Sequence, residues 1–186
     1  MKKQPEITDA TRESFVNAFF QLAKTKSINR ITIREITTLA GYNRTTFYRY
    51  FEDVYALVEY AEDEFLKSVR TALEAHGAAE SISDDKFFEV IINSFHENKE
   101  RISILVSEQN RSHFLRKIKE AITSHVDQEH NVTPKKRIIM DIYFYGIFHA
   151  ISTNLQSKNA LSDEDLMDVI KAMFNSWYRP EMTREA

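Results

Sequence analysis

The chain contains 186 residues, has a formal net charge of −3, and includes only three glycines, three prolines and no cysteine. This length suits one or two domains with a substantial hydrophobic core, and so few turn-forming residues argue for an all-helical protein rather than a β-rich one. The lack of cysteine excludes disulfides, thiolate metal sites and thiol nucleophiles.

Two helices are predicted at the start of the chain. Phe15, Phe19 and Leu22 recur at i, i+4 and i+7, which predicts an amphipathic helix over about residues 9–24. Thr32 and Glu35 have the spacing of a capping box, so a second, short helix is expected to begin there.

A third and a fourth helix follow a lone glycine. Gly41 interrupts the second helix, and Asn43 is a good N-cap for a third helix that ends near Phe51. A long fourth helix is predicted from about residue 53 to residue 76, because Gly77 provides a natural end.

Five further helices are predicted in the rest of the chain. Pro134 suits the first position of a helix, since it has no amide hydrogen to leave unpaired, and Ser162 suits an N-cap. We place these helices at about residues 87–95, 102–106, 112–126, 134–157 and from 162 onward. The expected fold class is therefore all-α, with about nine helices.

The second and third helices, joined by a turn with one glycine, match the helix-turn-helix arrangement. One arc of the third helix combines guanidinium, hydroxyl and phenol groups without a carboxylate: Arg44, Thr45, Tyr48 and Arg49. Arginine can bond guanine in the major groove, threonine can bond a base edge, and tyrosine can donate to phosphate. We predict that this arc contacts duplex DNA. The alternative that Tyr48 and Tyr50 only cap a small core stays open.

Charge is distributed unevenly along the chain. Residues 1–51 hold nine basic and four acidic side chains, whereas the remainder holds 16 basic and 24 acidic ones. A basic end on an acidic body indicates a polyanionic partner for the first part of the chain, although a solvated basic face is an equally simple interpretation.

The sequence from about residue 9 to residue 62 resembles the N-terminal domain of the TetR family of bacterial transcriptional repressors. The resemblance rests on "T-x-x-x-I-x-x-x-A-G" over residues 32–41 and "T-x-Y-x-Y-F" over residues 46–51. It implies a three-helix DNA-binding head over residues 1–52 and a helical body for effector binding and dimerisation over residues 53–186. The DNA-binding positions that it implies are Arg34, Tyr42, Asn43, Arg44, Thr45, Tyr48, Arg49 and Tyr50.

The chain departs from the family pattern just after the "Y-F" motif. Val54 stands where the family often has a lysine that touches phosphate. We therefore expect weaker binding, or a larger contribution from Lys2, Lys3 and Lys26.

The last two helices are predicted to pair two copies of the chain. Residues 138–151 are apolar on every side, so a second copy is a natural cover for part of that helix. The resemblance implies the same, because family members usually dimerise through their last two long helices. The predicted interface residues are Ile142, Gly146, Ala150, Leu166, Ile170, Met173 and Trp177.

The body is rich in aromatic residues, which in the family would surround a cavity for a small effector. The predicted effector pocket comprises Phe88, Phe95, Phe114, Phe144, Phe148 and His149, with an apolar or aromatic effector. Ordinary core packing is the competing interpretation of the same residues.

An enzyme is not expected, because no catalytic motif, phosphate loop or metal-ligand spacing is present, and we predict no metal or cofactor. We also expect a cytoplasmic protein, since neither a signal peptide nor a membrane span is evident. The predicted function is a ligand-responsive repressor that binds a palindromic operator as a homodimer. The alternative is a regulator of the same fold that acts through a protein partner, with weakened DNA binding.

Overall fold

The computed structural model describes residues 5–75, 85–106, 111–126, 133–178 and 180. These residues form nine α-helices and no strand, which confirms the all-α fold class. The helices are α1 (Pro5–Ala23), α2 (Ile33–Ala40), α3 (Arg44–Phe47), α4 (Val54–Ala75), α5 (Asp85–Glu97), α6 (Lys99–Leu105), α7 (Arg111–Val126), α8 (Pro134–Gln156) and α9 (Asp163–Met173).

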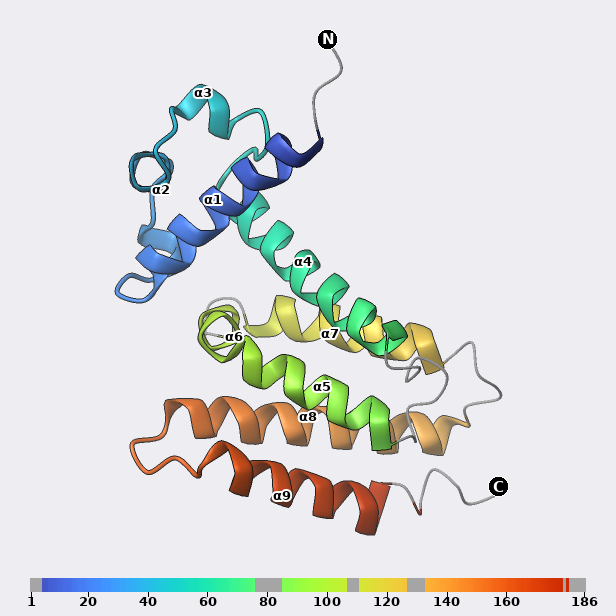
Figure 1. The fold of residues 1–186 in the computed structure, drawn as a ribbon. Helices are drawn as coiled ribbons and strands as arrows, with labels where there is room; N and C mark the ends of the chain where they lie inside the picture. Colours follow the sequence, from blue (N-terminus) through green and yellow to red (C-terminus); the bar gives the residue numbers. More distant parts are fainter. Residues whose placement is uncertain (1–4, 76–84, 107–110, 127–132, 179, 181–186) are drawn as a thin grey trace.

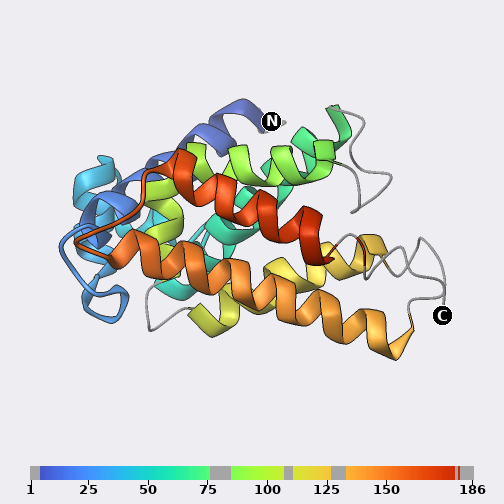
Figure 2. The same cartoon turned by 90° about the horizontal axis from the view of Figure 1, so that it is seen from below.

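The helices are arranged from one end of the molecule to the other. Helices α1, α2 and α3 form a head at one end, and α8 and α9 lie together at the opposite end (Figure 1). Helix α4 runs from the head into the body, where it packs against α5 and α7, and α1 also contacts α6. The view from below shows α8 and α9 side by side along their length (Figure 2).

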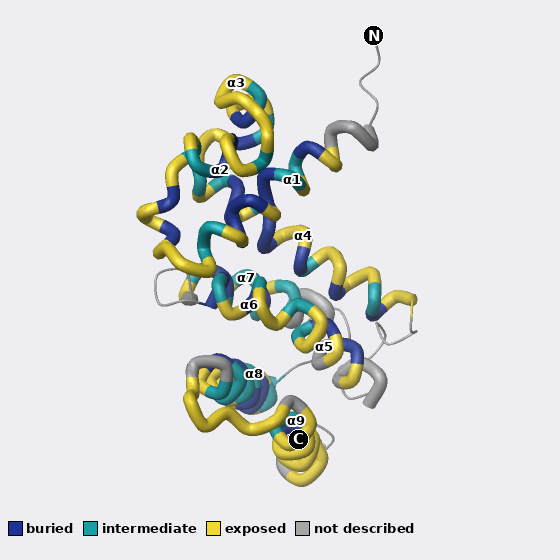
Figure 3. The backbone as a smooth tube through the Cα atoms, turned by 60° about the vertical axis from the view of Figure 1, so that its left-hand side comes forward, coloured by how far each residue is buried: buried dark blue, intermediate teal, exposed yellow. Residues whose placement is uncertain are grey.

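Aromatic packing holds the head together. Phe15 and Phe47 are fully buried, and their ring centroids lie 5.3 Å apart in an edge-to-face arrangement. Phe51 adds a second ring 5.5 Å from Phe47 and packs in turn against Tyr60 of α4. The buried segments follow the inner sides of α1 and α4 (Figure 3). The head core thus continues along α4 into the body.

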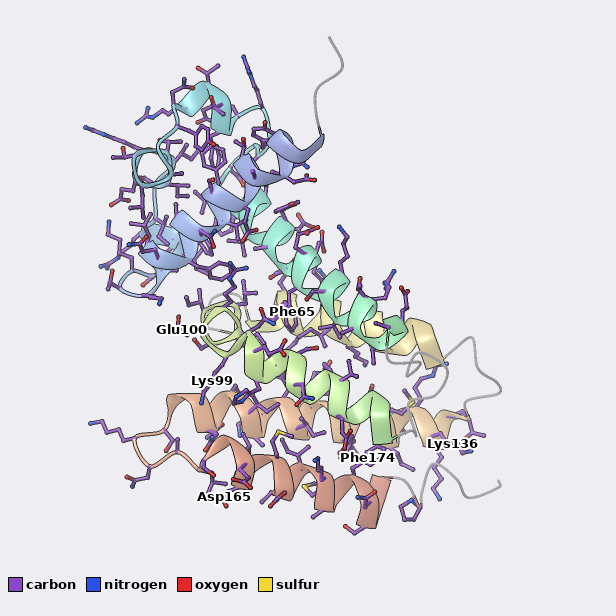
Figure 4. All side chains as sticks on the ribbon, in the orientation of Figure 1. Phe65, Lys99, Glu100, Lys136, Asp165 and Phe174 are labelled. Atoms are coloured by element: carbon purple, nitrogen blue, oxygen red, sulfur yellow. The ribbon has the colours of Figure 1, made fainter. Side chains whose placement is uncertain are left out.

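The α8–α9 hairpin has a small core of its own. Ile139, Met140 and Tyr143 of α8 pack against Ile170 of α9 and against Phe174. The Tyr143 hydroxyl also donates to the Ile170 carbonyl at 3.3 Å. Phe174, labelled in Figure 4, begins a short π-helix, Phe174–Tyr178, that follows α9.

Side-chain caps confirm the predicted starts of α2, α8 and α9, whereas α1, α5 and α6 begin earlier than predicted, at Pro5, Asp85 and Lys99. Thr32 and Glu35 form the predicted capping box at α2, and the side chains of Thr133 and Ser162 cap α8 and α9. The 3₁₀-helix Ile28–Arg30 and the π-helix after α9 were not predicted. Gly77, the predicted end of α4, lies outside the described residues.

The prediction of a third helix reaching Phe51 is wrong. Helix α3 ends at Phe47, and the next turn tightens so that the Arg49 amide donates to the Thr46 carbonyl, at 3.2 Å, rather than one residue further back. This i→i+3 spacing belongs to 3₁₀ geometry, with about three residues per turn. Phe51 is nevertheless buried in the head core, so the tightened turn still delivers its ring to the predicted place.

Candidate nucleic-acid interface

The turn between α2 and α3 depends on a left-handed glycine. Gly41 has φ 76° and ψ 24°, and its amide donates to carbonyls in the last turn of α2. The amide of Tyr42 donates to the Thr37 carbonyl at 2.9 Å, which completes the helix stop. An L-residue pays about 1–2 kcal/mol in this conformation, so glycine is suited to redirecting the chain here.

Helix α3 is short but anchored at both ends. The Asn43 side-chain oxygen accepts hydrogen bonds from the Thr46 amide at 2.8 Å and from the Thr46 hydroxyl at 3.1 Å. Phe47 is fully buried against the head core. Asn43, predicted to contact DNA, thus has its oxygen engaged as the cap of α3.

The outer side of this region is exposed and carries no carboxylate. Arg44, Thr45, Tyr48 and Arg49 are all exposed, and Tyr48 retains 58% of its surface. No acidic residue occurs in the sequence between Glu35 and Glu52. The surface therefore offers guanidinium, hydroxyl and phenol groups together, the set that suits phosphates and base edges.

Three other predicted contact residues surround this surface. Arg34 is exposed on α2. Tyr42 is 39% exposed, with its ring centroid 5.2 Å from that of Phe15. Tyr50 is half-buried, and its ring centroid lies 6.4 Å from that of Phe15. The Arg12 guanidinium carbon lies 5.5 Å from the centre of the same Tyr50 ring. Tyr50 packs against the head core, as its competing interpretation held, whereas Tyr42 is exposed and touches the core through Phe15.

Neighbouring charges are partly engaged elsewhere. Lys26 forms an ion pair with Glu35, and hydrogen bonds from Lys26 and Thr32 lower the pKa of Glu35 to about 2. Lys26 is therefore engaged within the head, and Lys2 and Lys3 lie outside the described residues. At the start of α4, Val54 is half-buried and the Asp53 carboxylate accepts from the Ala56 amide at 2.8 Å.

The predicted effector residues form a packed aromatic cluster. Phe114 and Phe148 are buried, whereas Phe95 and Phe144 are half-buried. The ring centroids of Phe95 and Phe148 lie 6.5 Å apart. His149 is exposed, so it does not line this interior as predicted. The side chain of Phe88 lies outside the described residues. Effector binding stays a prediction.

The predicted dimer residues divide between the inside and the outside of the α8–α9 hairpin. Ile142 is 56% exposed and Met173 is 46% exposed, and a Cβ at the exposed Gly146 would meet no atom within 4 Å. Ala150 and Leu166 are half-buried, and the side chain of Trp177 lies outside the described residues. Ile170 is only 2% exposed because it packs inside its own hairpin, which corrects its predicted outward position.

Sequence reasoning missed other exposed apolar residues on the same hairpin. Ile138, Tyr145 and Val169 are 61%, 46% and 51% exposed. Ile138, Ile142 and Tyr145 follow one another at i, i+4 and i+7, a spacing that could have identified this stripe.

A cluster of charged and polar side chains around one buried carboxylate, between α4 and α7, was also missed. Glu62 is fully buried, and one of its carboxylate oxygens lies 3.1 Å from His113 Nδ1 and 3.4 Å from Lys117 Nζ. Glu62 and His113 are 51 residues apart in the sequence, so no local pattern indicates the contact.

Within the described part of the chain, no group of three or more histidine and acidic side chains could hold a metal ion. In the same residues, no helix has the length and apolar character needed to cross a bilayer.

Two known proteins resemble this chain, one in sequence and one in fold. Over 94 residues the chain is 36% identical to an uncharacterized HTH-type transcriptional regulator of Haemophilus influenzae, and the match covers 46% of this chain and 46% of that protein. The chain thus matches about half the length of this curated relative. The fold is similar to the crystal structure of a TetR transcriptional regulator from Streptococcus agalactiae 2603V, with a TM-score of 0.63 and 16% sequence identity, over 91% of this chain and 98% of that one. No protein-family model matches the chain. The chain therefore has the fold of a TetR regulator, as its sequence motifs predicted.

Proposed function

We propose that this chain, which has a TetR-type fold, is a DNA-binding transcriptional regulator that represses transcription by binding a palindromic operator as a homodimer. The observation that carries the proposal is the exposed, carboxylate-free surface of Arg44, Thr45, Tyr48 and Arg49 beside the left-handed Gly41 turn. In this proposal, residues 1–52 read DNA and residues 53–186 pair the two copies.

Each exposed group has a distinct part in the proposed contact. Arg44 would reach a base edge, where a guanidinium can bond guanine O6 and N7 together, and Thr45 would read the neighbouring position. Tyr48 and Arg49 would bond phosphate oxygens and set the register of the head on the duplex. The buried Phe47 supports these roles, because it holds the short helix against the head while its neighbours face outward.

The exposed side of the α8–α9 hairpin supports a second copy of the chain as partner. Its apolar side chains are between 46% and 61% exposed: Ile138, Ile142, Tyr145, Val169 and Met173. Two helices that each present such residues would form a four-helix contact when two copies meet. A two-fold axis there would give each dimer two heads, which read half-sites about 34–36 Å apart or a multiple of that distance.

The direct test is selection of binding sites from a library of random duplexes with the full chain. We expect inverted-repeat sequences to be recovered, and affinity to fall linearly with the logarithm of salt concentration, with a slope of about −0.9 for each phosphate contact. Recovery of no sequence at low salt would overturn the proposal and favour the regulator that acts through a protein partner. Recovery of single, unrepeated half-sites would overturn the dimeric part.

A further inference from the structure

Helix α6 belongs to the body, yet its first residues reach the head. Its inner side is held in the core by Ile102 and Leu105, each 1% exposed. Its outer side carries Glu100 and Arg101 beside α1, and Glu100 is labelled in Figure 4. Helix α6 is therefore firmly seated in the body while two of its charged side chains face α1.

Arg101 makes three contacts with α1. One guanidinium nitrogen lies 3.0 Å from a Glu13 carboxylate oxygen and 2.7 Å from the Asn17 side-chain oxygen. The guanidinium carbon also lies 5.2 Å from the centre of the Phe20 ring. A planar guanidinium that bonds two acceptors and stacks on an aromatic ring is held more specifically than a lone surface charge.

Glu100 adds a second ion pair next to the first. Its carboxylate accepts a hydrogen bond from Lys24 Nζ at 2.7 Å, and that bond lowers the pKa of Glu100. Four side chains of the head thus meet two side chains of α6. Three of them recur at i, i+4 and i+7 on one side of α1, and the fourth directly follows the end of that helix: Glu13, Asn17, Phe20 and Lys24.

These contacts lie away from the axis of α4, the continuous helix that joins head and body (Figure 1). A rigid head attached along a single helix can still turn as that helix bends or rotates. A second attachment beside the axis removes that freedom. The contacts are also accessible to water, since Arg101 is 42% exposed and Glu100 is 79% exposed, so they can open without unfolding α6.

We propose that Glu100 and Arg101 form a polar clasp that fixes the orientation of the head on the body. Where the proposed function holds, the clasp also sets the separation of the two α3 helices on an operator. The clasp positions the DNA-reading surface without touching DNA itself.

The orientation is measured without DNA. The chain contains no cysteine, so Thr38→Cys in the head and Asn93→Cys in the body give two defined sites for spin labels. Labelled protein is mixed with excess unlabelled protein, so that each distance comes from within one chain. We expect a narrow distance distribution in the parent protein and a broader one in Arg101→Met and in Lys24→Glu.

A charge exchange provides the sharp control. The double variant Lys24→Glu, Glu100→Lys should restore the narrow distribution, because it reverses the ion pair without removing it. Ser103→Ala, on the exposed side of α6, should leave the distribution unchanged, since the Ser103 hydroxyl bonds only the Glu100 carbonyl within the helix among the described contacts. Unaltered widths in Arg101→Met and Lys24→Glu would overturn the clasp, whether or not the protein binds DNA.

The DNA measurement tests the consequence for spacing. Arg101→Met should weaken binding to the preferred operator by about fivefold and reduce the penalty for inserting or removing one base pair between half-sites. The salt dependence should keep its slope, because no phosphate contact is lost. A lower slope would show that Arg101 contacts DNA directly and would overturn its role as a positioning residue. Failure of the parent protein to bind any duplex would refute the proposed function and leave the label measurement as the test of the clasp.

Discussion

Removal of the Lys117 charge should destabilise the chain strongly because it leaves a buried carboxylate with less compensation. Lys117 lies on α7 and approaches three acidic side chains of α4. Its Nζ lies 2.6 Å from Asp63, 3.4 Å from Glu62 and 3.7 Å from Glu59. The perturbation is Lys117→Met, which keeps much of the aliphatic side chain and removes the ammonium group.

The three acidic partners do not contribute equally. Asp63 and Glu59 are each 59% exposed, so losing either contact should cost at most about 1 kcal/mol. Glu62 is fully buried, and breaking a buried pair on one side typically costs about 3–5 kcal/mol. His113 remains 3.1 Å from Glu62 and can keep part of the compensation. We therefore expect Lys117→Met to lower the free energy of unfolding by about 2–4 kcal/mol.

The assay is urea unfolding followed by circular dichroism, arranged as a double-mutant cycle. Glu62→Gln removes the buried charge, so adding Lys117→Met to it should cost much less than Lys117→Met alone, with a coupling energy of about 1–3 kcal/mol. Asp63→Asn is the matched control, because it removes the shortest contact of Lys117 at an exposed site and should cost less than about 1 kcal/mol.

Alkaline pH provides a signature of the Lys117 charge among all its acidic partners, of which Asp63 contributes most to the pKa. Burial alone would lower the pKa of Lys117, but its hydrogen bond to Asp63 and the charges of Asp63 and Glu62 outweigh burial and raise the pKa. A raised pKa means that the folded chain holds this proton more tightly than the unfolded chain. The contribution is thus fully present below about pH 10.4 and is lost as the pH rises through the folded value. Additive costs in the cycle, or a loss no larger than that of Asp63→Asn, would refute the idea that Lys117 compensates Glu62.

Four further outcomes are expected. Arg44→Ala should weaken operator binding, measured by fluorescence anisotropy, by about 1–3 kcal/mol and should weaken the preference for one particular base at a single operator position. An equal loss of affinity on all sequences would show that Arg44 reads no base. Ile142→Glu should convert dimer to monomer in sedimentation, whereas Lys158→Glu, in the loop after α8, should not; an unchanged mass would contradict the proposed interface. Gly41→Ala should lower the free energy of unfolding by about 1–2 kcal/mol through backbone strain alone, since a Cβ there meets no atom within 4 Å. The pKa of Glu35 is lowered to about 2, so its contribution to the free energy of unfolding is present above about pH 4.3 and is lost as the pH falls toward 2. In acid titrations of stability, Glu35→Gln should therefore lose less free energy of unfolding over this pH range than the parent chain.

The features predicted correctly from sequence are those that depend on residues close together in the chain. The capping box of Thr32 and Glu35 and the cap of Asn43 each join residues three apart, so their pattern is visible in the sequence. The stop at Gly41 is equally local. The helix-turn-helix and the exposed arc after it follow from these signals, which is why the candidate DNA surface could be outlined in advance.

The features that were missed depend on contacts between distant segments. The end of α3 at Phe47 accompanies the packing of Phe51 and Tyr60, and a pattern search cannot weigh that packing against continued helix. The buried Glu62 joins α4 to His113 and Lys117 of α7, and each of these residues alone resembles ordinary surface charge in the sequence.

The α8–α9 hairpin shows why an apolar pattern alone does not identify an interface. A stripe of apolar residues can face the same chain or a second copy, and both choices require the same helical spacing. Ile170 was predicted to face outward and packs inward, whereas Ile138 was not singled out and is 61% exposed. The two environments predict different consequences of substitution. A polar group at Ile170 should unfold the hairpin at any protein concentration, whereas one at Ile138 should leave the fold intact and shift only the concentration at which two copies associate.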